Sequence, residues 1–177
     1  LRFKVNELTL IPRADTETLV EEVIDRIGNK KVTVLDIGAG SGCIGVSIAK
    51  FCKNADVTML DYSASILDVA AANADLNGVR VKTEKCDILE EIPEGKFDVV
   101  VSNPPYIETD TIFSLDNIVS SYEPVEALDG GFDGLMFYRR IIEISSEILK
   151  NNGLIAFEIG YNQGEEVTEM LKEEGFS

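Results

Sequence analysis

The stretch VTVLDIGAGSGCIGVSIAKF at residues 32–51 combines three local signals in a fixed order. Val32–Ile37 is a short, β-branched apolar run, which predicts a buried strand. Glycines at positions 38, 40 and 42 follow, and they let the backbone turn tightly and approach a ligand. Cys43–Phe51 then predicts a helix, whose first turn offers free N–H groups. Such a strand–turn–helix unit is typical of α/β domains that bind a nucleotide-like ligand at the turn.

The rest of the chain continues the alternation of strands and helices. Further strands are predicted at Asp56–Tyr62, Val79–Cys86, Phe97–Ser102 and Leu154–Ile159. Further helices are predicted at Asp15–Ile27, from the N-cap Ser63 to about Leu76 with Asn77-Gly78 as its end, at Leu135–Leu149 and at Gly164–Glu174. Because the strands show little alternation and are joined by helices, we expect a mostly parallel sheet with helices on both faces, a Rossmann-like α/β fold. With 177 residues, the chain is long enough for one well-buried domain, residues 1–177.

Charge and composition limit the possible partners. The formal net charge is −16, from 32 acidic and 16 basic residues, and the Lys and Arg residues form no cluster. A phosphate backbone would be repelled by such a surface, which argues against direct binding of nucleic acid. No apolar run approaches the roughly 20 residues of a membrane span, so no membrane partner is expected. Three cysteines without a C-x-x-C pair fit free thiols in a reducing cytoplasm.

The chain has no histidine. Any chemistry must therefore proceed without imidazole as a base or as a metal ligand, and we expect no metal site. The longest stretch without regular signals is 103–134, where loops would carry the function.

Two cofactors compete for the glycine-rich turn. Gly40–Gly45 matches the G-x-G-x-x-G fingerprint of dinucleotides, and Asp61 at the end of the second strand suits the ribose of NAD or of S-adenosylmethionine. Asp36, just before the glycines, could face the cationic amino acid half of S-adenosylmethionine, whereas it would repel a pyrophosphate. We therefore interpret the turn as a methyl-donor site. The predicted cofactor-binding residues are Asp36, Gly38, Ala39, Gly40, Ser41, Gly42, Asp61, Asp87, Ile88 and Asn103.

Asp87 and Ile88 follow the third predicted strand. The Asp87 carboxylate could bond the adenine amino group, and Ile88 could pack on the adenine face. An alternative for Asp87 is a strand-end Asx turn, which the sequence leaves equally open.

The fourth strand ends in a turn formed by Asn103, Pro104, Pro105 and Tyr106, which we predict to be the catalytic residues. Two prolines stiffen the turn and leave its carbonyls unpaired. A planar NH₂ group could donate one hydrogen to the Asn103 side-chain oxygen and the other to the Pro104 carbonyl, while Tyr106 stacks on it. This arrangement predicts methyl transfer to a planar, conjugated nitrogen by alignment rather than by acid–base help. The alternative is a structural Pro-Pro turn capped by Asn103.

Further motifs indicate which kind of methyltransferase the chain resembles. They are LIPRADTE at 10–17, YEP at 122–124 with Ala127-Leu128, GGFDGL at 130–135, Tyr138-Arg139, and FEIG with Gln163-Gly164 at 157–164. Together with the glycine loop and the NPPY turn, they resemble the protein-(glutamine-N5) methyltransferases that modify peptide chain release factors, over nearly the whole chain. Ala14 stands where that family usually has proline. A role for the segment around Glu123 in the substrate channel is also expected.

The resemblance implies an enzyme that transfers methyl from S-adenosylmethionine to the glutamine of a Gly-Gly-Gln loop, leaving S-adenosylhomocysteine. It implies that Gly38–Gly42, Asp61 and Ile88 contact the cofactor and that residues 103–106 hold the glutamine. Family members also carry an N-terminal helical domain and closing C-terminal strands, so we expect the chain to be a catalytic fragment. Two other functions stay open: amino methylation of adenine in DNA or RNA, and a non-catalytic S-adenosylmethionine-binding module.

Overall fold

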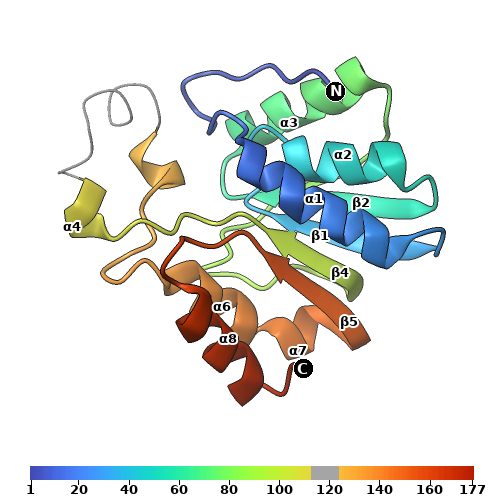
Figure 1. Cartoon of the computed structure of the whole chain (residues 1–177). Coiled ribbons are helices and arrows are strands. Elements are labelled where there is room, and N and C mark those ends of the chain that lie inside the picture. The colour runs from blue at the N-terminus through green and yellow to red at the C-terminus, as the bar shows by residue number, and fades with distance from the viewer. Residues whose placement is uncertain (113–123) are drawn as a thin grey trace.

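The computed structural model describes residues 1–112 and 124–177 (Figure 1). Its strands are β1 (Val32–Ile37), β2 (Ala55–Asp61), β3 (Lys82–Lys85), β4 (Phe97–Ser102) and β5 (Leu149–Phe157). Its helices are α1 (Ala14–Ile27), α2 (Cys43–Phe51), α3 (Ala64–Asn77), α4 (Thr109–Ile112), the 3-10 turn η1 (Val125–Ala127), α6 (Met136–Glu143), α7 (Ser145–Ile148) and α8 (Gly164–Glu173). No helix of these two ranges is both long enough and apolar enough to span a membrane.

The strands of the described ranges form one sheet in the order β3-β2-β1-β4-β5, and all neighbouring pairs are parallel. Helices α1, α2 and α3 cover one face, and α6, α7 and α8 cover the other (Figure 1). The chain moves outward from β1 to β3 and then returns to place β4 on the other side of β1. The carboxyl ends of β1 and β4 therefore flank a topological switch point, where α/β folds bind their ligands.

Burial on both faces explains why the strands lack alternation. In β1, Val34 packs into the core under α1–α3, while its neighbour Leu35 packs into the core under α6 and α7, and both are fully buried. A strand with two buried faces needs apolar residues at successive positions, as Val99, Val100 and Val101 of β4 also show. The predicted Rossmann-like parallel sheet is thus confirmed.

Several element boundaries follow the prediction closely. The bounds of β1, α2 and β4 are those predicted, and β2 is displaced by one residue. Gly78 ends α3 in the left-handed conformation, and its N–H donates to the carbonyls of Ala74 and Asp75. Ser63 does occupy the N-cap position of α3, but its side chain makes no capping hydrogen bond.

Other boundaries were predicted wrongly. β3 is only Lys82–Lys85, because no other residues of this edge segment pair with β2. The predicted helix 135–149 is divided at Ile144, whose ψ of 1° breaks the helix, and Leu149 already belongs to β5. β5 therefore begins five residues earlier than predicted, across an Asn-Asn-Gly sequence that suggests a turn. A register shift between Phe97 and Val99 of β4 accommodates these residues within the pairing of β4 with β5.

The N-terminal segment 1–10 is clamped along α3 by two asparagines. The Asn77 amide exchanges two hydrogen bonds with the backbone of Arg2, and the Asn73 amide does the same with Lys4. Asn73, which is fully buried, also donates to the Ser41 carbonyl in the glycine loop at 2.8 Å. The two Asn side chains thus make the backbone hydrogen bonds that a partner strand would supply, and they fix the start of the segment whose Leu8 and Leu10 line a cavity.

Candidate cofactor and acceptor site

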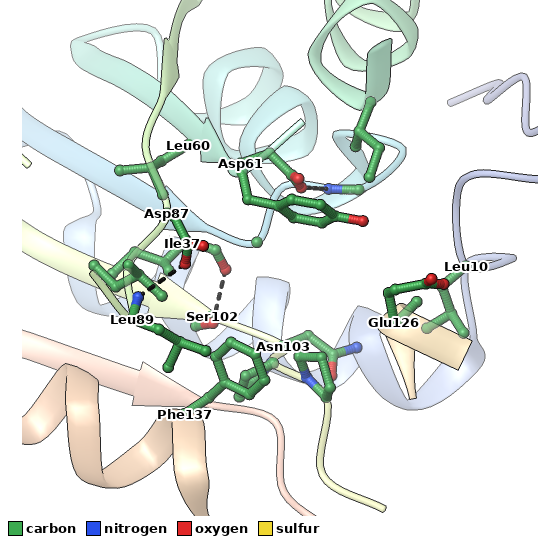
Figure 2. Close-up of a pocket in the computed structure, with 18 of the residues that line it drawn as sticks. Leu10, Ile37, Leu60, Asp61, Asp87, Leu89, Ser102, Asn103, Glu126 and Phe137 are labelled. Carbon is green, nitrogen blue, oxygen red and sulfur yellow. Dashed lines mark hydrogen bonds between the residues drawn. The ribbon is translucent and has the colours of Figure 1, made fainter. Parts of the chain in front are cut away.

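A cavity of about 360 Å³ opens at the carboxyl ends of β1, β2 and β4. Its wall comes from the glycine loop, the ends of β2 and β3, the turn after β4, the N-terminal segment, η1 and the start of α6. Figure 2 shows side chains from these separate segments pointing toward one space. The cavity lies at the topological switch point, where a ligand is expected in a fold of this kind.

In the glycine loop, Gly38 and Gly40 line the cavity. Their φ angles are 72° and 54°, a left-handed conformation that favours glycine. The backbone N–H groups of Gly38 and Ala39 both donate to the Leu60 carbonyl at 2.9 Å, which ties the loop to the end of β2. A Cβ at Gly38 would meet nothing within 4 Å, so glycine is required there by conformation rather than by crowding.

Asp36, Ala39, Ser41 and Gly42 do not line the cavity. Asp36 is fully buried beneath the loop, where one carboxylate oxygen accepts from the Gly45 N–H at 2.8 Å and the other has no partner among the described residues. Burial is the main cause that raises the pKa of Asp36 to about 7. The hydrogen bond from Gly45 lowers this pKa, and the negative charge of Asp61 raises it by a smaller amount. Asp36 thus braces the loop against α2 and does not face the cofactor space as expected.

The other three residues are packed. Ala39 and Ser41 are buried, and a Cβ at Gly42 would lie 3.1 Å from the Ala70 Cβ. Gly42 therefore permits the close approach of the loop to α3. Any contact of these residues with a cofactor stays a prediction.

Asp61 stands at the wall of the cavity and is 5% exposed. One of its carboxylate oxygens accepts from the Gly40 N–H at 3.1 Å, which Figure 2 marks, and the other accepts from the Ser63 N–H at 3.3 Å. Burial raises the pKa of this carboxyl, while the backbone hydrogen bonds lower it. Its predicted bond to ribose stays a prediction that its position permits.

Asp87 and Ile88 both line the cavity. An Asp87 carboxylate oxygen accepts from the Leu89 N–H at 3.1 Å, so the Asx turn that the sequence left open is present. That turn uses one oxygen and still leaves Asp87 at the cavity wall. The Ile88 side chain is buried, and its carbonyl accepts from the Arg140 guanidinium at 2.9 Å.

The turn after β4 brings Asn103, Pro104 and Pro105 to the cavity. The Ser102 hydroxyl donates to the Ile37 carbonyl at 2.7 Å, which locks the end of β4 to the end of β1 (Figure 2). The Asn103 side-chain N–H donates to the Thr16 hydroxyl of α1 at 3.4 Å.

Tyr106 does not line the cavity. Its ring packs on a separate cluster that contains Tyr138 and Val167. The stacking of Tyr106 on an acceptor stays a prediction, and in this structure its ring lies against that cluster instead of the cavity.

A buried glutamine supports the acceptor turn from behind. The Gln163 side-chain N–H₂ donates to the carbonyls of Tyr106 and Gly134 at 3.0 and 3.1 Å, and its oxygen accepts from the Gly160 N–H at 2.9 Å. Gly134 has a φ of 72°, and a Cβ there would meet the Tyr106 carbonyl oxygen. The GGFDGL and FEIG motifs thus meet at one point and hold the backbone of the turn.

Sequence reasoning missed several residues of the cavity. Tyr62, Glu126 and Phe137 line it, and Figure 2 shows Phe137 reaching from α6 toward the wall that carries Asn103. Phe137 lies in a helix with apolar residues at helical spacing, so its sequence pattern indicates core. Tyr122 and Glu123, for which a channel role was expected, lie outside the described residues.

A parallel sheet with a glycine loop after β1 and a cavity at the switch point is the fold of class I S-adenosylmethionine-dependent methyltransferases. Solved structures agree: a ribosomal protein L11 methylase from Lactobacillus delbrueckii aligns over 96% of this chain and 72% of its own, with a TM-score of 0.67 and 24% identity. The hMettl16 catalytic domain aligns over 99% and 67%, with a TM-score of 0.73 and 19% identity. The chain belongs to the methyltransferase small domain family, whose model matches residues 14–121.

Closer relatives come from several bacteria. The release factor glutamine methyltransferase of Clostridium acetobutylicum is 49% identical over 181 residues, which cover 99% of this chain and 64% of that protein. Those of Geobacter sulfurreducens and Fusobacterium nucleatum are 43% and 41% identical, over 62% and 51% of their lengths. The chain thus matches nearly end to end but spans less than two thirds of these relatives.

Proposed function

We propose that this chain carries the catalytic site of an enzyme that methylates the side-chain amide nitrogen of the glutamine in the Gly-Gly-Gln loop of peptide chain release factors. The observation that carries the proposal is the position of Asn103, Pro104 and Pro105 on the wall of the same cavity as the glycine loop and Asp61. An acceptor held by this turn lies directly beside a donor held by the loop. The similarity to release factor glutamine methyltransferases supports the choice of acceptor.

The charges in the cavity favour S-adenosylmethionine as the donor. The described residues of its wall include four carboxyl groups and neither Lys nor Arg; the four are Asp61, Asp87, Glu126 and Asp129. Such a lining suits a ligand with a sulfonium, an ammonium group and no phosphate, and it would repel the pyrophosphate of a dinucleotide. In this proposal, Asp61 accepts hydrogen bonds from the ribose hydroxyls, and Ile88 packs against the adenine.

The same charges disfavour adenine in DNA or RNA as the acceptor. A nucleic acid substrate needs cations near the acceptor turn to neutralise phosphates. The net charge of −16 and a cavity wall without described Lys or Arg point the other way. The negative charge would instead attract a basic protein partner. Because release factors act in translation termination, the proposed substrate implies that the enzyme works in the cytoplasm.

The proposed methyl transfer depends on how the turn and the loop position the acceptor and the donor. S-adenosylmethionine supplies an electrophilic methyl group, and the nitrogen–carbon bond forms as the sulfur–carbon bond breaks, leaving S-adenosylhomocysteine. The Asn103 oxygen and the Pro104 carbonyl each accept one hydrogen of the glutamine amide, which aims its nitrogen, and one of these protons is released to solvent. An amide nitrogen is a poor nucleophile, so alignment must contribute much of the rate; well-oriented reactants gain on the order of 7–11 kcal/mol.

The test is transfer of labelled methyl from S-adenosylmethionine to a release factor, with a Gln→Ala variant of its Gly-Gly-Gln loop as the matched control. We expect label on the first protein only. Equal labelling of the two would refute glutamine as the acceptor. The N103A variant tests the site: it should keep cofactor binding by calorimetry and lose turnover, whereas loss of both would assign Asn103 to the fold.

A further inference from the structure

A short chain of hydrogen bonds joins the acceptor turn to α1 and to the segment after β5. The Asn103 amide nitrogen lies 3.4 Å from the Thr16 hydroxyl oxygen, and that hydroxyl lies 2.7 Å from a carboxylate oxygen of Glu158. The three residues come from the turn after β4, from α1 and from the segment after β5. Thr16 is 4% exposed, so water does not compete freely for its hydroxyl.

The chemistry of the three groups fixes the direction of both bonds. A carboxylate only accepts, so the single hydrogen of the Thr16 hydroxyl is donated to Glu158. The Thr16 oxygen can then offer only lone pairs to Asn103. The Asn103 amide must therefore turn its NH₂ toward Thr16, because the flipped amide would set two acceptor oxygens against each other. A bond of 3.4 Å is weak in itself, and its effect is to choose between two orientations.

Two hydrogen bonds hold the backbone of Glu158 in place. Its N–H donates to the Ser102 carbonyl at 3.0 Å, directly beside Asn103, and its carbonyl accepts from the hydroxyl of the fully buried Tyr138 at 2.9 Å. The backbone of Glu158 is thus fixed relative to the turn that carries Asn103. The hydrogen bond between Glu158 and Ser102 thus links the end of β5 to the end of β4.

We infer that Thr16 and Glu158 are positioning residues, which orient the Asn103 amide so that its oxygen, and not its nitrogen, is presented to the acceptor. Among the described residues, that oxygen has no hydrogen-bond partner of its own, so it remains available in the cavity that Asn103 lines. The reversed amide would offer a second donor to the acceptor NH₂ and could not bind it. This inference rests on the proposed function, because it takes an acceptor that donates hydrogen bonds.

The test compares T16V, which removes the hydroxyl at nearly constant shape, with T16S, which keeps it. T18V is the matched control, since Thr18 is an exposed residue of the same helix. In the complete protein, we expect T16V to lower kcat for methyl transfer about 10-fold, equivalent to about 1.4 kcal/mol. T16S and T18V should stay within about 2-fold of the wild type, and the cofactor Kd should not change in any of them.

A second measurement does not depend on the acceptor. In ¹H–¹⁵N spectra of protein labelled at asparagine, the Asn103 side-chain pair is assigned by its loss in N103A, and it should shift in T16V but not in T18V. An unmoved pair or an unchanged kcat in T16V would overturn the inference. If N103A keeps full turnover, the proposed role of Asn103 fails instead, and the shift in T16V still reports whether Thr16 orients the amide.

If T16V does not fold, E158L takes its place. A leucine at 158 cannot accept the Thr16 hydrogen, which can then be donated to Asn103 and permits the flipped amide. We expect a lower kcat and a shifted Asn103 pair in the folded variant. Wild-type kcat or an unmoved pair in E158L would refute the inference.

Discussion

The buried carboxyl of Asp36 predicts a stability that falls as the pH rises. Its pKa is raised from an ordinary 3.8 to about 7 in the folded chain, mainly by burial. Between these two values, the folded state holds a proton that the unfolded state has released. The contribution of Asp36 to the free energy of unfolding is therefore complete below about pH 4 and is lost as the pH rises through about 7.

The magnitude follows from the two pKa values. At 1.36 kcal/mol per pH unit, the difference between 3.8 and about 7 corresponds to about 4 kcal/mol, which is an upper bound for the loss. In D36N nothing titrates at this position, so the loss should be absent. The asparagine can still accept from the Gly45 N–H, and the cost of its unpartnered NH₂ does not depend on pH. The test therefore uses only how the difference in free energy of unfolding between wild type and D36N changes with pH.

The assay is urea unfolding of wild type and D36N from pH 4 to pH 8, without cofactor. The free energy of unfolding of the wild type relative to D36N should fall by about 2–4 kcal/mol over this range. D68N provides a control, since it removes an exposed carboxyl of α3. A wild type that gains stability relative to D36N as the pH rises, or parallel curves for the two, would refute the reasoning, because Asp36 would then be charged in the folded chain.

Three further predictions concern the site. N103A should bind S-adenosylmethionine within about 3-fold of the wild type in calorimetry while its turnover falls about 100-fold or more, since it removes an acceptor aimed at the reacting group. D61A should weaken cofactor binding about 10–100-fold, because charge-assisted hydrogen bonds contribute about 1.5–3 kcal/mol, and a Kd within 2-fold would remove Asp61 from the site. G134A should lower the melting temperature by several degrees more than G175A, where φ is 88° but a Cβ meets nothing within 4 Å, because only Gly134 faces the Tyr106 carbonyl; equal losses would contradict this contact.

Much of the fold could be predicted because its signals are local. The apolar run Val32–Ile37, the glycines that follow it and the helix-ending Gly78 each act on their own neighbours, and the structure follows them closely. The prediction was wrong where a long-range pairing overrides a local signal. Asn152-Gly153 suggests a turn, yet the register shift against β4 keeps these residues within β5.

For the site, the sequence identified the segments better than the side chains. Asp36 and Tyr106 lie in the predicted segments, but neither reaches the cavity, because the direction of a side chain depends on packing against distant elements. Phe137 and the hydrogen bonds of Thr16 could not have been predicted, since both depend on how helices from opposite ends of the chain approach the turn. The carboxylates of the cavity wall likewise come from separate segments.

The most direct test of the central claim is mass spectrometry of a release factor after incubation with the complete protein and S-adenosylmethionine. Fragmentation of the peptide that contains the Gly-Gly-Gln loop locates any added methyl group. We expect a single methyl group on the side-chain nitrogen of that glutamine, and none with N103A. A methyl group on another residue, or an unmodified glutamine when the same enzyme methylates adenine in nucleic acid, would contradict the claim.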